Sequence, residues 1–174
     1  FYKIITDSRL GKEVEKTEKD AEYLGSNLLS EAESGWDFTP RFNARAECFA
    51  PIDLNSLLYE NEKILAFFGE LLGEKNAYEE AAVRRAELIR RHCTVNGDFY
   101  DYDSVRETCS PVISPALLMP YLCGLSDNAE KALRIIQRLQ TKYGIPATEK
   151  TEEYGKYQWS YPNIWPPLVC LSVM

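Results

Sequence analysis

The most constraining feature of the sequence is an apolar pattern with helical spacing that begins at Asp53 and ends at Gly73. Within it, large apolar side chains recur every three or four positions, which predicts an amphipathic helix with one face in a core. A second helix is predicted from Asn76 to about Cys93, because Asn76 and Glu79 have the spacing of a capping box. The short connection makes the two helices an antiparallel αα-hairpin. The apolar positions of the first helix are Leu54, Leu57, Leu58, Ile64, Leu65, Phe68, Leu71 and Leu72.

Further helices are predicted on both sides of this hairpin. A charged, helix-prone segment covers about 11–33. An apolar helix is predicted over about 114–122, because Pro115 suits a first helical turn. Another helix is predicted over 126–143, with Gly144 as its stop. These last two helices form a second hairpin.

Together these elements predict an all-α fold of successive antiparallel helix hairpins. Residues 97–103 alternate aromatic and acidic side chains, which suits an extended segment between the hairpins. Long aromatic-rich loops fall at the same end of each pair, as they do in an α-solenoid or in part of an α/α toroid. Because no short motif recurs at a fixed period, a partial toroid is favoured.

The composition argues against several classes of partner. The chain of 174 residues has 20 Lys and Arg against 27 Asp and Glu, a net charge of −7. Its basic residues are scattered among acids, apart from the arginines within 84–91, a run typical of a solvated helix face, so no nucleic-acid partner is expected. No apolar stretch approaches the roughly 18 residues of a membrane span, so no membrane association is expected. The first residues show neither a signal-peptide pattern nor an initiator Met, which favours a cytoplasmic location and a processed or partial chain.

The five cysteines are widely spread, with no CxxC pair and only His92 as a companion. A disulfide framework or a zinc site would show different spacing, so we predict no metal and no cofactor. Buried free thiols in a reducing compartment are the expected state. A nucleophile made of His92 and Cys93 is the alternative, and it is disfavoured because adjacent side chains on a helix diverge. The cysteines are Cys48, Cys93, Cys109, Cys123 and Cys170.

Two loops together carry the side chains that a sugar site needs. Residues 33–42 read ESGWDFTPRF and residues 158–167 read QWSYPNIWPP. Sugar rings present apolar faces that stack on aromatic rings and hydroxyl groups that need polar partners. Partial desolvation of Asp37 between Trp36 and Phe38 favours its protonated form and suits it to donate a proton to a glycosidic oxygen. The alternative is that Asp37 caps a helix while the aromatic residues belong to the core.

The first loop resembles the ESGWDFSxRW segment of the trehalases, which are glycoside hydrolases with an (α/α)6 toroid. Two further segments resemble this family in the same order. Residues 50–59, APIDLNSLLY, are similar to its PVDLNALLY helix start, and residues 158–168, QWSYPNIWPPL, are similar to its QWDxPxGWxPL signature. Residues 97–103, GDFYDYD, are similar to its G-x-F-x-D-Y-D segment. Ordered motifs are more specific than a single one, and they imply that residues 1–174 form a single domain, an incomplete arc of the toroid from the central part of the catalytic domain.

The resemblance implies roles for individual residues in both loops. Asp37 is the expected general acid, and Gly35 is expected to contact sugar through its backbone. Trp159 is the expected stacking wall, with Gln158 and Asn163 as nearby hydrogen-bonding residues. The implied reaction is the inverting hydrolysis of trehalose to glucose, so the expected partner is a small carbohydrate, an α-glucoside such as a disaccharide.

Other residues are assigned less directly. Trp36 and Arg41 either line the site, as further substrate-binding residues, or pack beneath it. Asp53 is interpreted as a helix cap, because an Asp two residues after Pro51 opens a helix well.

The sequence also departs from the family pattern. Ser160 stands where the family usually has Asp, and Ile164 where it usually has Gly, so substrate contacts there are expected to differ. The PGGRFxExYxWDxY signature is absent, as is the Gly-rich segment that bears the catalytic base. An inverting hydrolase needs a second carboxylate roughly 6.5–9.5 Å from the first. Since Glu152 and Glu153 lie in a charged, solvated run, the base is expected outside the chain.

Three alternatives therefore stay open. The protein is an α-glucosidase of a related (α/α)6 family with another substrate, a non-catalytic carbohydrate-binding helical fragment, or a solenoid scaffold for a protein partner. The scaffold is the least favoured, because it gives no reason for the two loops to occur in this order.

Overall fold

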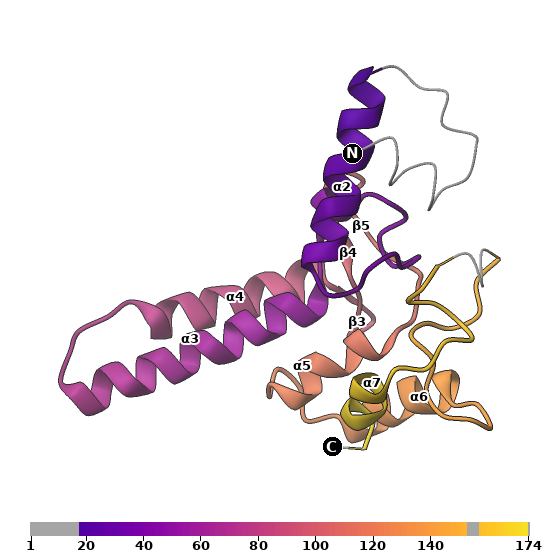
Figure 1. Cartoon of the computed structure of the whole chain (residues 1–174). Helices are drawn as coiled ribbons and strands as arrows, with labels where there is room; N and C mark the ends of the chain where they lie inside the picture. Colours follow the sequence, from indigo (N-terminus) through magenta and orange to yellow (C-terminus); the bar gives the residue numbers. More distant parts are fainter. Residues whose placement is uncertain (1–17, 153–156, 174) are drawn as a thin grey trace.

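The structure, a computed structural model, describes residues 18–152 and 157–173 (Figure 1). Most of its regular structure is helical, which confirms the predicted all-α class. The predicted first helix is described from Glu18 onward, and its predicted start at 11–17 lies outside the described residues. In chain order the elements are α2 (Glu18–Glu33), η1 (Ala46–Cys48), β1 (Phe49–Ala50), α3 (Ile52–Leu72), α4 (Tyr78–His92), β2 (Thr94–Val95), β3 (Asp98–Phe99), β4 (Tyr102–Asp103), β5 (Thr108–Cys109), η2 (Pro115–Leu118), α5 (Met119–Leu122), α6 (Ala129–Leu139) and α7 (Pro166–Leu171).

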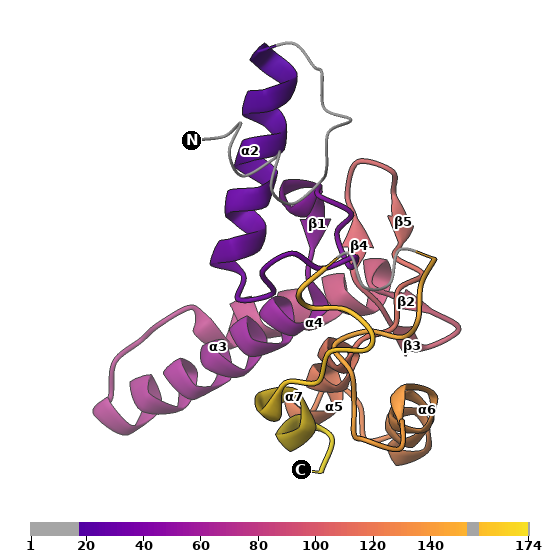
Figure 2. The same cartoon turned by 45° about the vertical axis from the view of Figure 1, so that its right-hand side comes forward.

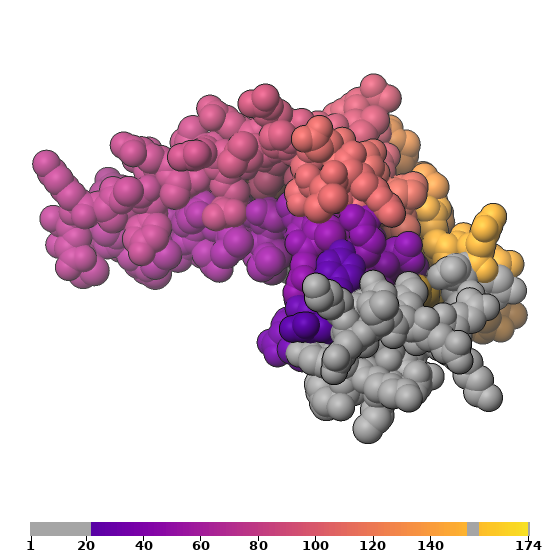
Figure 3. All heavy atoms as spheres, turned by 90° about the horizontal axis from the view of Figure 1, so that it is seen from above, coloured from indigo at the N-terminus to yellow at the C-terminus, as the bar shows by residue number. Residues whose placement is uncertain are grey.

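The predicted hairpin is confirmed as α3 and α4, which lie side by side and extend from the rest of the molecule as an arm (Figures 1 and 3). α3 ends at Gly73, whose φ of 69° is left-handed, a conformation that glycine adopts without steric cost. α4 begins after Ala77, and the Asn76 side chain accepts a hydrogen bond from the Tyr78 N–H at 3.0 Å. The hairpin is therefore defined by local signals that the sequence carries.

The predicted core face of α3 is wrong for the described part of the chain. All of the apolar positions named for this helix are exposed, from 37% at Leu58 to 72% at Leu72. The residues of α3 that are buried are Ile52, Ser56 and Gly69. Periodicity identifies an apolar face but not what covers it, and among the described elements α3 packs mainly on α4, α5 and η2.

Short strands connect the arm to the rest of the molecule. β1, β4 and β5 form an antiparallel sheet in that order, with Phe49 opposite Asp103 and Tyr102 opposite Cys109. β2 and β3 form a two-stranded ladder in which Thr94 lies opposite Phe99. The predicted extended segment at 97–103 is therefore confirmed.

The C-terminal elements differ from the prediction in their type and bounds. The apolar helix predicted over about 114–122 is a 3-10 helix, η2, followed by the short α-helix α5, and the helix predicted from 126 begins at Ala129. α6 begins after Asn128, whose side chain accepts from the Lys131 N–H at 3.1 Å, and it ends at Leu139 rather than Tyr143. The helix stops because Gln140 is already extended, and a bridge between Thr141 and Gly144 closes a tight turn. Gly144 therefore belongs to this turn and is not the helix stop.

The elements surround one core below α2. α2 lies on one side of the short strands, and α5, α6 and α7 gather on the other (Figure 2). The core includes Phe42 from the first loop, Ile52 at the start of α3, and Ala147, which precedes the second loop; each is 0% exposed. Both loops are thus anchored in the same core. In the described residues, no helix combines the length and the apolar character that crossing a membrane requires.

Candidate functional site

The first loop leaves α2 through a tight turn that presents Asp37 between two left-handed residues. Gly35 has φ 78° and Phe38 has φ 60°, so the chain reverses on both sides of Asp37. The turn is fixed by the Ser34 hydroxyl, which donates to the Glu31 carbonyl at 2.6 Å and accepts from the Trp36 N–H at 3.2 Å. The loop is therefore a built structure and not a linker.

Asp37 itself is only partly buried. Within the part of the chain that the structure describes, its carboxyl makes no hydrogen bond or ion pair. The residue precedes no helix, because the next helical element begins at Ala46. The alternative interpretation of Asp37 as a helix cap is therefore wrong.

Beneath the loop lies a buried ionic cluster centred on Arg41, which is 1% exposed. Its guanidinium donates two hydrogen bonds to Asp101, at 2.8 and 2.9 Å, and two to Asp53, both at 3.0 Å. Burial alone would lower the pKa of Arg41, but the charges of Asp101 and Asp53 outweigh it and raise the pKa above its ordinary value. For Asp53, burial would raise the pKa, but the charge of Arg41 outweighs burial and holds the pKa below its ordinary value.

This cluster answers two questions that the sequence left open. Arg41 packs beneath the site, with its guanidinium carbon 4.3 Å from the Trp36 ring centre and its hydrogen bonds directed to carboxylates. Asp53 is not the helix cap that we expected, because Pro51 holds the cap position of α3. Its carboxylate accepts from the Leu54 N–H in the first turn at 3.0 Å, but also from Arg41 and from the Trp36 indole N–H, the last at 2.7 Å. Asp53 therefore fixes Trp36 in place.

The structure brings the two predicted loops together through their tryptophans. The rings of Trp36 and Trp159 are 5.4 Å apart, and those of Trp159 and Trp165 are stacked at 4.9 Å with 14° between their planes. A backbone hydrogen bond of 3.2 Å from the Trp159 N–H to the Phe38 carbonyl joins the loops directly. We call Trp36, Trp159 and Trp165 the aromatic wall. Trp36 is 8% exposed and belongs to the core, as the alternative interpretation expected, whereas Trp159 and Trp165 are partly exposed, and such rings can stack on the faces of a sugar.

The second loop is held by its own polar groups. The Asn163 amide donates to the Gln158 carbonyl at 2.9 Å, and the Ala147 N–H donates to the Asn163 carbonyl at 2.9 Å. Ser160 is 0% exposed and donates to the Tyr157 carbonyl at 2.9 Å, so at this departure from the family pattern the side chain braces the loop. Gln158 and Asn163 are both exposed and remain accessible to a ligand.

Sequence reasoning missed one residue of this site, Glu31. Its side chain is 1% exposed, and one carboxyl oxygen accepts a hydrogen bond from the Thr39 N–H, while the other has no hydrogen-bond partner among the residues that the structure describes. Burial raises its pKa to about 7, against smaller lowering effects of the Thr39 N–H and Arg41. The signal was the spacing, because Glu31 follows buried Leu28 by three positions on α2 and so falls on its buried face.

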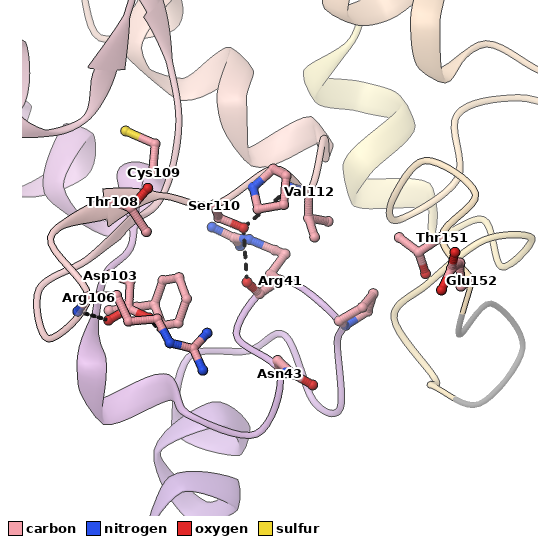
Figure 4. Close-up of a pocket in the computed structure, with 13 residues that line it drawn as sticks. Arg41, Asn43, Asp103, Arg106, Thr108, Cys109, Ser110, Val112, Thr151 and Glu152 are labelled. Atoms are coloured by element: carbon pink, nitrogen blue, oxygen red, sulfur yellow. Dashed lines mark hydrogen bonds and ion pairs between the residues drawn. The ribbon is translucent and has the colours of Figure 1, made fainter.

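A separate hollow of about 430 Å³ lies beside the ionic cluster (Figure 4). Of the predicted site residues, only Arg41 lines it, and Thr151 and Glu152 face the others from its far side. Its Asp103 is paired with Arg45 at 2.6 Å. Neither Asp37 nor the aromatic wall borders this hollow. We therefore do not take the hollow as the candidate site, and place the site where Asp37 and the aromatic wall lie together.

The remaining candidate groups show no separate chemistry. The described residues include no group of three His, Cys, Asp or Glu placed to hold a metal ion. The five cysteines are free, and Cys170 is exposed rather than buried as predicted, while Cys109 is only partly buried. Burial raises the pKa of Cys93 to about 12, and the His92 ring packs on Tyr102 at 5.1 Å. Cys93 therefore stays a thiol, and a nucleophile of the two residues is not supported.

Comparison with known proteins places this geometry in context. A family model described as Trehalase matches residues 3–174. The chain is 33% identical to the periplasmic trehalase of Xanthomonas axonopodis pv. citri, over 97% of this chain and 31% of that protein. It is 30% identical to the trehalase of Homo sapiens, over 90% of this chain and 30% of that protein.

A solved structure gives a similar result. The fold matches that of neutral trehalase Nth1 from Saccharomyces cerevisiae with a TM-score of 0.79 and 25% sequence identity, over 90% of this chain and 32% of that chain. The chain thus spans 30–31% of the length of the two relatives named above.

Proposed function

Because the chain belongs to the trehalase family, we propose that the protein hydrolyses the α-glucosidic bond of trehalose with inversion, and that Asp37 is the general acid. The observation that carries this proposal is the state of the Asp37 carboxyl. It is accessible and makes no ion pair with the described residues, and it follows Trp36 of the aromatic wall directly. A carboxyl that is not neutralised by an arginine can exchange a proton with a substrate oxygen.

The loops supply the binding groups for this reaction. A glucose ring stacks on Trp159 of the wall, whose orientation is set by Trp36 and Trp165. Gly35 offers its backbone, and Gln158 and Asn163 offer exposed amide groups to sugar hydroxyls. Arg41 and Asp53 hold Trp36 from below and do not touch the sugar.

The chemistry follows from the placement of Asp37. Its carboxylic acid donates a proton to the glycosidic oxygen as the bond between that oxygen and the anomeric carbon breaks, and water adds to the anomeric carbon from the opposite face. A base outside these residues takes the proton from that water. Glu31 does not fill this role, because a side chain that is 1% exposed gives no room for the water. The products are one glucose in the β form and one in the α form.

The test uses the whole protein, with whatever sequence flanks these residues in its gene. Trehalose is added, and the first products are followed by proton NMR before the anomers interconvert. Equal initial amounts of α- and β-glucose support the proposal. Two α-glucose molecules per turnover would contradict inversion, and no turnover would contradict the proposed activity.

A second substrate class is kept because of Ser160 and Ile164, which replace residues usual in the family. Related hydrolases of other α-linked gluco-oligosaccharides share the architecture, so the same assay is run with a maltose series. A higher kcat/KM on trehalose supports our assignment, and a higher value on the maltose series would favour the alternative. Sugar binding without turnover of either would indicate a carbohydrate-binding protein.

The predicted cytoplasmic location remains a prediction. One relative is named a periplasmic trehalase. Fractionation of the source cells with an antibody against the protein decides between these compartments.

A further inference from the structure

The buried carboxyl of Glu31 is not needed for the chemistry proposed above, and it lies where it can control the loop that carries Asp37. Glu31 is in the last turn of α2, and its side chain reaches back under the loop to the Thr39 N–H. Thr39 is itself 0% exposed and accepts a hydrogen bond from the Arg41 N–H at 3.3 Å. The contact thus ties the helix to the backbone two residues after Asp37, at the point where the loop enters the core.

The peptide group between Phe38 and Thr39 is bound on both of its sides. Its N–H donates to Glu31, and its carbonyl oxygen accepts from the Trp159 N–H of the second loop at 3.2 Å. A planar peptide points its N–H and its carbonyl in opposite directions, so fixing the N–H also aims the carbonyl. Glu31 therefore orients a peptide that joins the two loops.

This peptide also follows a strained residue. Phe38 has φ 60°, a left-handed conformation that costs a residue other than glycine about 1 kcal/mol or more. Such a conformation persists only where neighbouring contacts hold it. Relaxation of Phe38 would rotate the backbone next to Asp37 and move the Asp37 carboxyl.

We propose that Glu31 is a positioning residue for Asp37 and Trp159, acting through the hydrogen bond that its buried carboxyl accepts from the Thr39 amide. The expected effect on kcat rests on the proposed function. The expected effect on the position of the Thr39 peptide does not. The charges that act on Glu31 are those of Arg41 and Asp37. Because Arg41 is already bound by Asp53 and Asp101, it is not available to pair with an ionised Glu31. The neutral acid keeps the acceptor for Thr39 and avoids an unpaired buried charge.

Two substitutions of Glu31 distinguish the role of its hydrogen-bond acceptor from the role of its acidic group. Glu31→Gln keeps an oxygen acceptor of the same shape, whereas Glu31→Met fills the same space without one. Glu22→Met is the control, because Glu22 is an exposed glutamate on α2 that lies outside the first loop. All proteins are assayed on trehalose well below their unfolding temperatures, and the concentration of folded protein is measured for each.

We expect Glu31→Met to lower kcat by at least about tenfold with a smaller change in KM, because misplacing a catalytic group affects the transition state more than ground-state binding. Glu31→Gln restores kcat to within about threefold of wild type, and Glu22→Met is unchanged. A kcat for Glu31→Met equal to that of the control would overturn the proposal, as would equal losses in the Gln and Met variants.

A second readout needs no substrate. Hydrogen exchange of the Thr39 amide is expected to be slow in wild type and Glu31→Gln and at least about tenfold faster in Glu31→Met. If wild type does not hydrolyse trehalose, the proposed function fails, and this exchange measurement still tests the position of the loop. Equal protection in Glu31→Met and wild type would show that Glu31 does not hold the Thr39 peptide.

Discussion

The ionic cluster beneath the first loop and the exposed edge of the same loop use one residue type in opposite ways. In the cluster, the carboxylates of Asp53 and Asp101 are both paired with the buried Arg41. At the edge, Asp37 is partly exposed and has no ionic partner among the described residues. A carboxylate whose oxygens are bound by arginine fixes structure, whereas one without an ionic partner keeps its oxygens accessible to a ligand. In our proposal, the partner of each aspartate, rather than its position in a motif, separates the supporting role of Asp53 and Asp101 from the chemical role of Asp37.

The largest expected effect comes from breaking the cluster with Arg41→Met. This change leaves Asp53 and Asp101 buried without a cation, so the free energy of unfolding of the whole protein should fall by about 3–5 kcal/mol. Chemical denaturation measures it. Arg84→Met is the control, because Arg84 is exposed on α4, and its effect should stay within about 0.5 kcal/mol. If the two variants are equally stable, the cluster does not support the loop.

Glu31 adds a pH-dependent case to this comparison. It is buried like the ionic cluster, but it forms no ion pair with the described residues. Its pKa is raised by burial from 4.5 to about 7, so the folded state binds a proton more tightly than the unfolded state does. The contribution of Glu31 to the free energy of unfolding is therefore fully present below pH 4.5. It is lost as the pH rises to about 7, by about 3 kcal/mol in total. Unfolding measured across this range should show the fall in wild type.

The Glu31→Gln variant has no group to titrate at this position. The difference in unfolding free energy between wild type and this variant should therefore change over the same pH range, in favour of the variant at the higher pH. A difference that stays constant with pH would mean that Glu31 ionises normally in the folded protein.

A smaller effect is expected where the cluster meets the aromatic wall. Trp36→Phe keeps an aromatic ring but removes the indole N–H that donates a hydrogen bond to Asp53, so the unfolding free energy should fall by about 2 kcal/mol. Trp165→Phe is the comparison, because its N–H makes only a 3.4 Å contact with the Gln158 carbonyl. A loss for Trp36→Phe no greater than that for Trp165→Phe would show that Asp53 does not fix the wall.

The fold and the candidate site could be predicted from the sequence only in part. Features set by neighbouring residues could be predicted, whereas features set by residues far apart in the chain could not. The hairpin of α3 and α4 is set by local spacing and by Gly73, and it was predicted closely. The order of the motifs identified the family, and the family match confirms it. The apolar face of α3 was predicted to lie in the core but is exposed, because a periodic pattern does not specify what packs against it.

The cluster could not be predicted in the same way. Arg41 and Asp101 are 60 positions apart, and a chain with 27 acidic residues offers many other partners for an arginine. Asp53 looked like a helix cap because its local position suits one, and only the tertiary contact with Arg41 shows its role. Glu31 was missed because a glutamate near a helix end is ordinarily solvated, and its burial depends on how the following loop folds back.

The measurement that tests the central claim most directly is the activity and stability of Asp37→Asn in the whole protein. The amide cannot donate the catalytic proton, so kcat on trehalose should fall by about 10²–10⁴-fold, while the unfolding free energy stays within about 0.5 kcal/mol of wild type. Glu152→Gln also replaces an acid by its amide, at an exposed carboxylate beside the hollow of Figure 4, and it should leave both quantities unchanged. Wild-type turnover by Asp37→Asn would contradict the assignment of Asp37 as the acid.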